Sequence, residues 1–286
     1  MRLSLRINRA IWSRLPDALR NTRMGRCYGS MLHVSVRRSA DRRQYLGTAF
    51  LRNRALLEQI RRLAAAQPVG ASFDLAVLGC SIGAEVYSVL WNIRMARPDL
   101  KARTVALDIS PEVLAVAERA AYSSESSALV GWSIFDRLSE AEREQIFDWE
   151  GNKGTVKPWI REGVRFQLGN AADPELVCTL GPQDMVLASN FLCHMEPIAA
   201  QSCLRNIARL VKPGGHLLVV GVDLDVREKL AREFGWQPVP DLIREIHEGD
   251  RDVRRDWPCE WWGLEPLDDR RRDWQLRYGA IFQLKG

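Results

Sequence analysis

A glycine-rich turn and an acidic residue are the first features of this 286-residue chain that could do chemistry. Gly79 and Gly83 flank the turn, where glycine lets the backbone approach a ligand closely, and the small Cys80 and Ser81 lie between them. Asp108 follows 29 residues after Gly79. A carboxylate at that distance can accept hydrogen bonds from both hydroxyls of a ribose. The turn and the acid together indicate a nucleoside-binding site.

Each of these signals also has a purely structural interpretation. The turn lacks the Gly-x-Gly-x-x-Gly spacing of dinucleotide sites and the Gly-Lys-Ser/Thr of phosphate-binding loops, so tight packing could explain its glycines. Asp108 could cap the following helix, although Ser110 already has a side chain suited to that task. Both signals are expected at the carboxyl ends of adjacent strands, where open α/β sheets bind ligands. That shared location favours a binding site.

An alternation of apolar strands and helices must position these residues. The expected strands are 73–79, 103–108, 164–168, 185–189 and 216–222, with a closing pair at 236–239 and 280–284; the expected helices are 53–66, 85–97 and 198–211. This order predicts a mostly parallel sheet with crossover helices. Residues 212–215 (Lys-Pro-Gly-Gly) are typical of a helix stop and turn. The tryptophan-rich stretch 250–274 shows neither a helix pattern nor a strand pattern, so no structure is predicted for it.

Charge is distributed unevenly along the chain. Residues 1–64 hold 15 arginines and three acidic residues, a balance of +12, so the overall charge of +5 leaves −7 for the rest. Apolar side chains recur every fourth position in the first twenty residues, with arginines mainly between them: Leu3, Ile7, Ile11, Leu15 and Leu19. This pattern predicts a basic amphipathic helix. It could pack on its own domain, bind an acidic partner or an anionic surface, or target the protein, since a mitochondrial transit peptide is similar.

Composition further limits the classes of protein to which this chain could belong. The six cysteines form no Cys-x-x-Cys pair and no Cys/His metal spacing, so we expect no metal site and a reduced, cytoplasmic protein. No apolar run approaches the roughly 20 residues that span a bilayer, so we expect no stable membrane insertion. The acidic body and the lack of an amino-methylation motif (Asn/Asp-Pro-Pro-Tyr) argue against a nucleic-acid acceptor.

Several motifs resemble, in the same order, those of the CheR-type methyltransferases, which act on glutamates of chemotaxis receptors. The segment 48–53 (Thr-Ala-Phe-Leu-Arg-Asn) is similar to the family's Thr-x-Phe-Phe-Arg segment. The turn at 79–88 keeps the family's glycines, its second glutamate and its Tyr-Ser pair. Three further likenesses are a Val-Lys-Pro insertion at 156–158, an adenine-side loop at 169–174 and an asparagine segment at 189–192. The number and order of these motifs make the resemblance specific.

The resemblance implies an α/β fold of the class I methyltransferases, with a Rossmann-like, mostly parallel seven-stranded sheet. It implies a short basic helical segment at 1–69, an S-adenosyl-L-methionine-binding domain at 70–286, and that cofactor. Thr48 and Arg52 are implied to reach the methionine end of the cofactor or the acceptor. The remaining implied contacts are Glu85 with the amino group, Asp108 with the ribose, Asn170 with the adenine and Asn190 with the transfer pocket; Gly79, Ser81, Gly83, Ala171 and Ser189 complete the expected set.

Two departures from the family leave the methyl acceptor open. The family has a large helical domain before Thr48, where 47 residues stand here, and a tyrosine where this chain has His194. A carboxylate, with a reference pKa of about 4.3, is ionised at neutral pH and needs no base, and Arg52 could orient it. A hydroxyl or amine acceptor would benefit from His194 as a general base, unless that histidine is structural.

Three functions therefore stay open, because function depends on the site rather than on the fold. The first is O-methylation of a protein carboxylate, with the arginine-rich segment binding an acidic helix. The second is methylation of a small molecule beneath a lid formed by residues 250–274. The third is a regulatory module that binds the cofactor without turnover.

Overall fold

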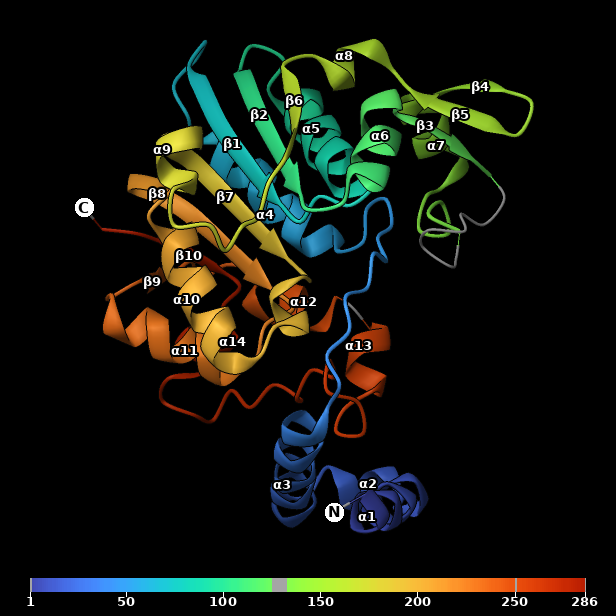
Figure 1. The fold of residues 1–286 in the computed structure, drawn as a ribbon, viewed down its shortest axis with the longest axis vertical. Helices are drawn as coiled ribbons and strands as arrows, with labels where there is room; N and C mark the ends of the chain where they lie inside the picture. The colour runs from blue at the N-terminus through green and yellow to red at the C-terminus, as the bar shows by residue number, and fades with distance from the viewer. Residues whose placement is uncertain (1, 125–132, 250, 286) are drawn as a thin grey trace.

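The chain begins with a small lobe of helices, described in a computed structural model that covers residues 2–124, 133–249 and 251–285. The lobe consists of α1 (Arg2–Arg14), α2 (Asp17–Arg20) and α3 (Arg23–Ser39). It lies at one end of the molecule, away from the main sheet (Figure 1). Its core contains Trp12, Leu32 and Val36, which pack around Trp257 from the far end of the chain. The lobe is thus held by a contact between the two ends of the sequence.

The apolar stripe expected at the start of the chain is not the face that packs. Leu5, Trp12 and Leu15 pack in the lobe core, whereas Ile7 and Ile11 are exposed. The expected single helix is also interrupted, since α1 ends at Arg14 and α2 begins after Pro16. The basic helix is present at Arg2–Arg14, but the large Trp12 ring, 5% exposed, lies on the side that packs, so Ile7 and Ile11 of the stripe are left exposed.

The main sheet has seven strands in the order β6-β2-β1-β7-β8-β10-β9. Their bounds are β1 (Ser72–Leu78), β2 (Lys101–Asp108), β6 (Val164–Leu168), β7 (Gln183–Ser189), β8 (Val211–Val220), β9 (Gln237–Pro238) and β10 (Ile281–Gln283). The first five of these pair in parallel, and β10 is antiparallel to both β8 and β9. The predicted mostly parallel sheet and its closing pair are confirmed. The expected turn at 212–215 lies inside β8, as a break in its register with β7.

Helices cover both faces of this sheet (Figure 1). On one face lie α4 (Arg54–Ala65), α5 (Ala84–Ala96) and α6 (Pro111–Arg119), and on the other α9 (Leu176–Leu180), α10 (Pro197–Ala208) and α11 (Leu224–Glu233). Leu75 and Val77 of β1 belong to the first core, and Ala76 and Leu78 to the second. This alternation explains why β1 is a continuous apolar run.

A smaller antiparallel sheet lies beside the main one. Its order is β3-β5-β4, formed by β3 (Ala121–Ser123), β4 (Phe147–Glu150) and β5 (Lys153–Val156), with α7 (Glu140–Ile146) and α8 (Pro158–Arg161) adjoining in sequence. Phe50 packs edge-on against Tyr122 and Phe147, with ring centroids 5.4 and 4.9 Å apart. These contacts hold the segment 48–53 against the small sheet.

The tryptophan-rich stretch contains one short helix and irregular backbone. After α12 (Ile243–Glu248) come α13 (Arg251–Arg255), a long loop, and α14 (Trp274–Tyr278). Trp257 of this loop enters the lobe core, and Trp261 lies against His194, with ring centroids 5.2 Å apart. The loop therefore joins the lobe to the edge of the main domain.

Candidate functional site

A cavity of about 390 Å³ opens at the carboxyl ends of β1, β2 and β7. Its lining includes eleven of the twelve predicted site residues: Thr48, Arg52, Gly79, Ser81, Glu85, Asp108, Asn170, Ala171, Ser189, Asn190 and His194. The structure thus brings together side chains separated by up to 146 positions in the sequence. Gly83 is the exception.

Gly83 supports the site without lining the cavity. It is the N-cap of α5 and has a left-handed backbone with φ of 85°. A Cβ atom there would lie 3.1 Å from the Ala117 side chain. Glycine at this position lets the turn close and α5 begin, so the prediction that Gly83 contacts the cofactor finds no geometric support.

Asp108 holds the glycine-rich turn against the end of β2. The Ser81 amide donates to one of its carboxylate oxygens at 2.8 Å, and the Ser110 amide to the other at 3.1 Å. Ser110 itself caps α6, as predicted, because its hydroxyl accepts from the Val113 amide. An ionised carboxylate has about four acceptor sites, so Asp108 keeps capacity for a ribose.

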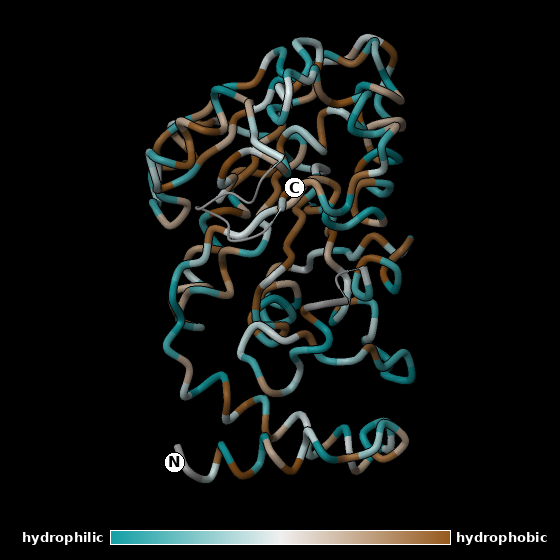
Figure 2. Tube along the Cα trace, turned by 90° about the vertical axis from the view of Figure 1, so that its right-hand side faces the viewer, coloured by the Kyte–Doolittle hydropathy of each residue, from teal (hydrophilic) through white to brown (hydrophobic). Residues whose placement is uncertain are grey.

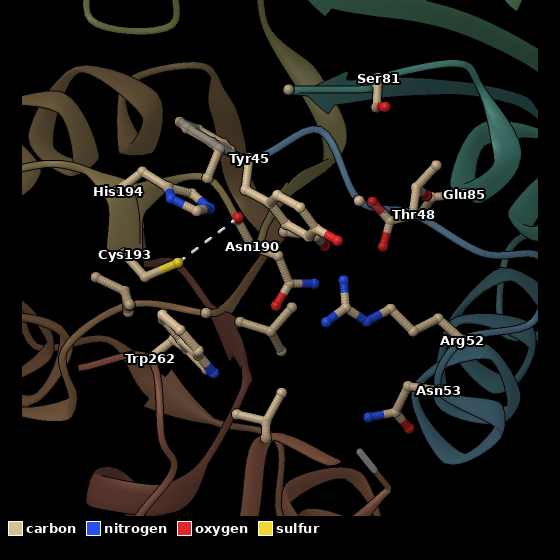
Figure 3. A pocket seen from close by; sticks show the side chains of 18 of the residues that line it. Tyr45, Thr48, Arg52, Asn53, Ser81, Glu85, Asn190, Cys193, His194 and Trp262 are labelled. Atoms are coloured by element: carbon tan, nitrogen blue, oxygen red, sulfur yellow. Dashed lines mark hydrogen bonds between the residues drawn. The ribbon is translucent and has the colours of Figure 1, made fainter. Parts of the chain in front are cut away.

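The segment 44–53 is fixed along the side of the cavity by contacts to the glycine-rich turn and α5. The Ser81 hydroxyl donates to the Leu46 carbonyl at 2.8 Å, and the Leu51 amide donates to the Ser88 hydroxyl at 3.0 Å. The Arg52 guanidinium extends from this segment into the cavity and toward Asn190 (Figure 3). A cation is thereby presented inside the cavity by a fixed backbone.

Glu85 is a largely buried acid in the first turn of α5. Burial raises its pKa, while the nearby Ser189 hydroxyl and the Arg52 charge act in the opposite direction. In Figure 3 its carboxyl group lies close to Thr48 at the edge of the cavity. A carboxylate destabilised by burial gains from a cationic ligand, which would restore its charged form.

His194 forms part of a contact between two loops. Its Nδ1 lies 2.5 Å from the Arg43 carbonyl oxygen, which can only accept, so Nδ1 carries the proton and Nε2 the lone pair. Burial lowers the pKa of His194, the contact with the Arg43 carbonyl opposes that shift in part, and the charge of Arg42 adds a smaller lowering effect. The ring is therefore neutral at neutral pH. The neighbouring Cys193 is also uncharged there, because burial raises its pKa to about 12.

Arg42 is a site residue that the sequence analysis missed. It donates to the carbonyls of Cys193 and Met195 at 3.1 and 2.8 Å and pairs with Asp223 at 2.9 Å. Its guanidinium also lies 5.6 Å from the centre of the Trp261 ring. Among so many arginines in residues 1–64, the sequence offered no signal that this one is buried.

Other lining residues were also missed. Tyr45, Asn53, Asp223, Trp261 and Trp262 all face the cavity. Asn53 is the last residue of the recognised segment and Tyr45 lies three positions before its start, so their place in the sequence was the only available signal. The tryptophans belong to the stretch that had no predicted structure.

Comparison with known proteins assigns the family. Residues 47–234 match the family described as "CheR methyltransferase, SAM binding domain". The chain belongs to the CheR methyltransferase family. Its match covers the segment 48–53, the glycine-rich turn and the loop of Asn190, which are the parts that build the cavity. It includes neither the helical lobe nor residues 250–274.

Two curated relatives share part of this CheR-family chain. The "Probable biofilm formation methyltransferase WspC" of Pseudomonas putida is 29% identical over 68% of this chain and 43% of its own length. An uncharacterised 104.1 kDa protein of Rhodobacter capsulatus is 26% identical over 61% of this chain and 18% of its own. The chain thus spans less than half the length of these relatives.

Solved structures resemble the chain at the level of the fold. The magnesium protoporphyrin IX methyltransferase of Synechocystis is 16% identical, with 64% of this chain and 69% of that one covered and a TM-score of 0.36. The CurJ carbon methyltransferase is 13% identical, with 82% and 54% covered and a TM-score of 0.40.

The side chains that line the cavity have the chemistry to hold S-adenosyl-L-methionine, the cofactor of the matched domain. Glu85 offers a buried carboxyl for a cationic amino group, and Asp108 a carboxylate for a ribose. The Asn170 side chain is partly engaged, since it accepts from the Ala172 amide at 2.9 Å. Within residues 2–124, 133–249 and 251–285, no cluster of histidine, cysteine or acidic side chains could hold a metal ion. Across the same residues, no helix is long and apolar enough to cross a membrane.

Proposed function

We propose that this CheR-family methyltransferase O-methylates a carboxylate, that of a glutamate side chain in a protein. The observation that carries the proposal is the Arg52 guanidinium, which extends into the cavity toward Asn190 (Figure 3). A guanidinium presents a planar set of donors that matches a carboxylate and binds it in a fixed orientation. A neutral hydroxyl or amine acceptor would gain much less from that group.

The other groups around Arg52 are consistent with an acceptor that is already ionised. When bound, the cofactor supplies an electrophilic methyl group carried by a sulfonium. An ionised carboxylate has a free lone pair for that carbon, so the protein has only to orient the acceptor and exclude water. Arg52 and the Asn190 amide are suited to holding the carboxylate. Cys193 is protonated and offers no competing nucleophile, since burial raises its pKa to about 12.

His194 has a structural task that does not depend on proton transfer. Its protonated Nδ1 binds the Arg43 carbonyl, and its ring lies edge-on against Trp261. It thereby connects the loop after β7 with the segment that precedes Thr48. We infer that His194 positions the cavity wall in the carboxylate reaction rather than acting as a base.

One observation favours a second candidate, methylation of a small molecule. Trp261 and Trp262 line the cavity, which would let residues 250–274 enclose an aromatic or apolar acceptor. In that case the Nε2 lone pair of His194 would serve as the general base for a hydroxyl or amine.

Labelling a cell extract with tritiated S-adenosylmethionine distinguishes these candidates. The carboxylate proposal expects label in protein, released as methanol by mild base. A base-stable label in a small product would instead support the second candidate. Tight cofactor binding without label in any fraction would support a regulatory module without turnover.

A matched pair of variants then tests Arg52 on the labelled acceptor. Arg52→Gln should raise the acceptor KM by about 10- to 100-fold, since a hydrogen bond to a charged group contributes about 1.5–3 kcal/mol. Arg62→Gln is the control, because Arg62 is exposed on α4 and pairs with Glu58. Equal acceptor kinetics in the two variants would remove Arg52 from the acceptor site.

A further inference from the structure

The helical lobe exposes apolar side chains at the end of the molecule away from the sheet. Five apolar residues of the lobe are about half exposed or more: Ile7 (53%), Ile11 (47%), Leu19 (53%), Met24 (84%) and Met31 (67%). They come from all three helices of the lobe. Figure 2 shows brown, hydrophobic positions along these helices at the bottom of the molecule. Exposed apolar residues gathered on one small lobe are typical of an interaction surface.

The orientation of α1 explains why its isoleucines are exposed. Leu5 and Trp12 of α1 pack into the lobe core. At about 100° per residue, Ile7 and Ile11 lie on neighbouring turns of a side that is rotated away from that core. One side of α1 therefore packs in the lobe core, and a second apolar stripe of the helix remains exposed.

The charged side chains of α1 are all of one sign. The sequence of α1 contains four arginines and no acidic residue, and Arg6 and Arg14 are exposed beside Ile7 and Ile11. Arg20, by contrast, is engaged by the lobe itself, since it donates to the carbonyls of Trp12 and Ser13. The cationic side chains beside the stripe can therefore accompany its isoleucines onto an anionic surface.

We propose that the lobe binds an anionic lipid surface, with α1 lying in the plane of the headgroups. Isoleucine, leucine and methionine flanked by arginines have the composition of helices that insert one side into an interface. The charge distribution also favours this arrangement. Residues 2–39, which form the lobe, contain nine arginines and one aspartate, a balance of +8, and the rest of the chain carries −3, so an anionic surface attracts the lobe rather than the catalytic domain.

Vesicle flotation of the full chain tests the proposal without a methyl acceptor, and so independently of the proposed function. Wild-type protein should bind vesicles of phosphatidylcholine with 30% phosphatidylglycerol at about 0.1 M salt, and pure phosphatidylcholine far more weakly. The double variant Ile7→Ser/Ile11→Ser should bind the anionic vesicles at least about tenfold less. Its control is Ile198→Ser, which removes an 81% exposed isoleucine from α10 and should bind normally. S-adenosylhomocysteine affinity confirms that each variant is folded.

Charge is tested by a second pair of variants. Arg6→Gln/Arg14→Gln should weaken binding by about 30-fold and reduce its salt dependence, because each basic residue near an anionic surface contributes about fivefold. Arg119→Gln/Arg209→Gln removes the same charge from exposed positions of the catalytic domain and should have little effect.

Three results would overturn the proposal. Wild-type protein that floats with neither kind of vesicle has no lipid-binding lobe. Binding to anionic vesicles that survives Ile7→Ser/Ile11→Ser but disappears in 0.5 M salt would be adsorption by charge alone. Preferential binding to polyglutamate, lost in the isoleucine variant, would identify an acidic protein as the partner instead.

Discussion

The Ser81 amide donates a hydrogen bond of 2.8 Å to the Asp108 carboxylate, which joins the glycine-rich turn to the end of β2. Two segments that the sequence suggested as separate signals are therefore one unit. Asp108 fixes the turn through its protein contacts and also lines the cavity.

We expect Asp108→Ala to weaken S-adenosylhomocysteine binding by about 1.5–3 kcal/mol, because hydrogen bonds to a charged acceptor are lost. Titration calorimetry measures the change. Asp108→Asn keeps one oxygen that can accept from the Ser81 amide, so the turn should stay in place while ribose binding weakens. Unchanged affinity in a folded Asp108→Ala protein would remove this residue from the site.

Glu85 should make the stability of the ligand-free protein depend on pH. Burial raises its pKa in the folded state above the ordinary value of 4.5, so ionisation opposes folding. The stability of the ligand-free protein should fall as the pH rises from about 4.5 through that raised pKa. Glu85→Gln removes this loss and should raise the Tm near pH 7, where about 2–4 °C corresponds to roughly 1 kcal/mol.

The same variant should bind the cofactor less well, since the carboxylate that faces a cationic amino group is gone. Calorimetric scans at several pH values, with and without S-adenosylhomocysteine, report both effects. A lower Tm for ligand-free Glu85→Gln at neutral pH would show that Glu85 has a stabilising partner in the folded protein.

His194 distinguishes the two acceptor classes through the pH dependence of kcat/KM. For a carboxylate acceptor, the rate should stay level down to about pH 5, where the acceptor itself becomes protonated, and His194→Tyr should be tolerated. For a hydroxyl or amine acceptor, His194→Phe should cost about 10²–10⁴-fold in rate.

Because burial lowers the pKa of His194, the loss of a histidine base would begin below its ordinary value of 6.5. The activities of the His194 variants therefore distinguish the two mechanisms better than the pH at which kcat/KM begins to fall. A level profile together with an inactive His194→Tyr enzyme would contradict both mechanisms and leave His194 as a wall or acceptor-contact residue.

Arg42 should be far more important for stability than its neighbour in sequence. Its side chain is 2% exposed and pairs with Asp223, whose side chain is 9% exposed. Arg42→Ala leaves that acid with only the more distant Arg37 guanidinium, 3.6 Å away, and should cost up to about 3–5 kcal/mol, the range typical of a broken buried pair. Arg43→Ala is the matched control, because Arg43 is 85% exposed and pairs only at the surface with Asp41. It should change stability by less than about 1 kcal/mol.

Urea unfolding of the two variants measures the difference. Comparable midpoints for Arg42→Ala and Arg43→Ala would mean that the contact between segment 41–48 and the loop after β7 is not part of the cooperative fold.

The sequence alone determined the sheet and gathered eleven predicted residues around the cavity. An apolar run such as β1 is recognisable because both of its faces are buried, and the glycine-rich turn and Asp108 lie at the ends of such runs. Parallel strands bring their carboxyl ends to one edge, so the order of the strands is enough to gather the residues that follow them.

Only the tertiary structure decided how the two ends of the chain are used. The spacing of Ile7 and Ile11 indicated an apolar side of α1, but the burial of Trp12 against Trp257 rotated that side toward solvent. The partners of Arg42 lie 151 and 153 positions away, at Cys193 and Met195. Local periodicity reports which side of an element is apolar, whereas its partner is chosen by contacts between distant segments, and these leave no local pattern.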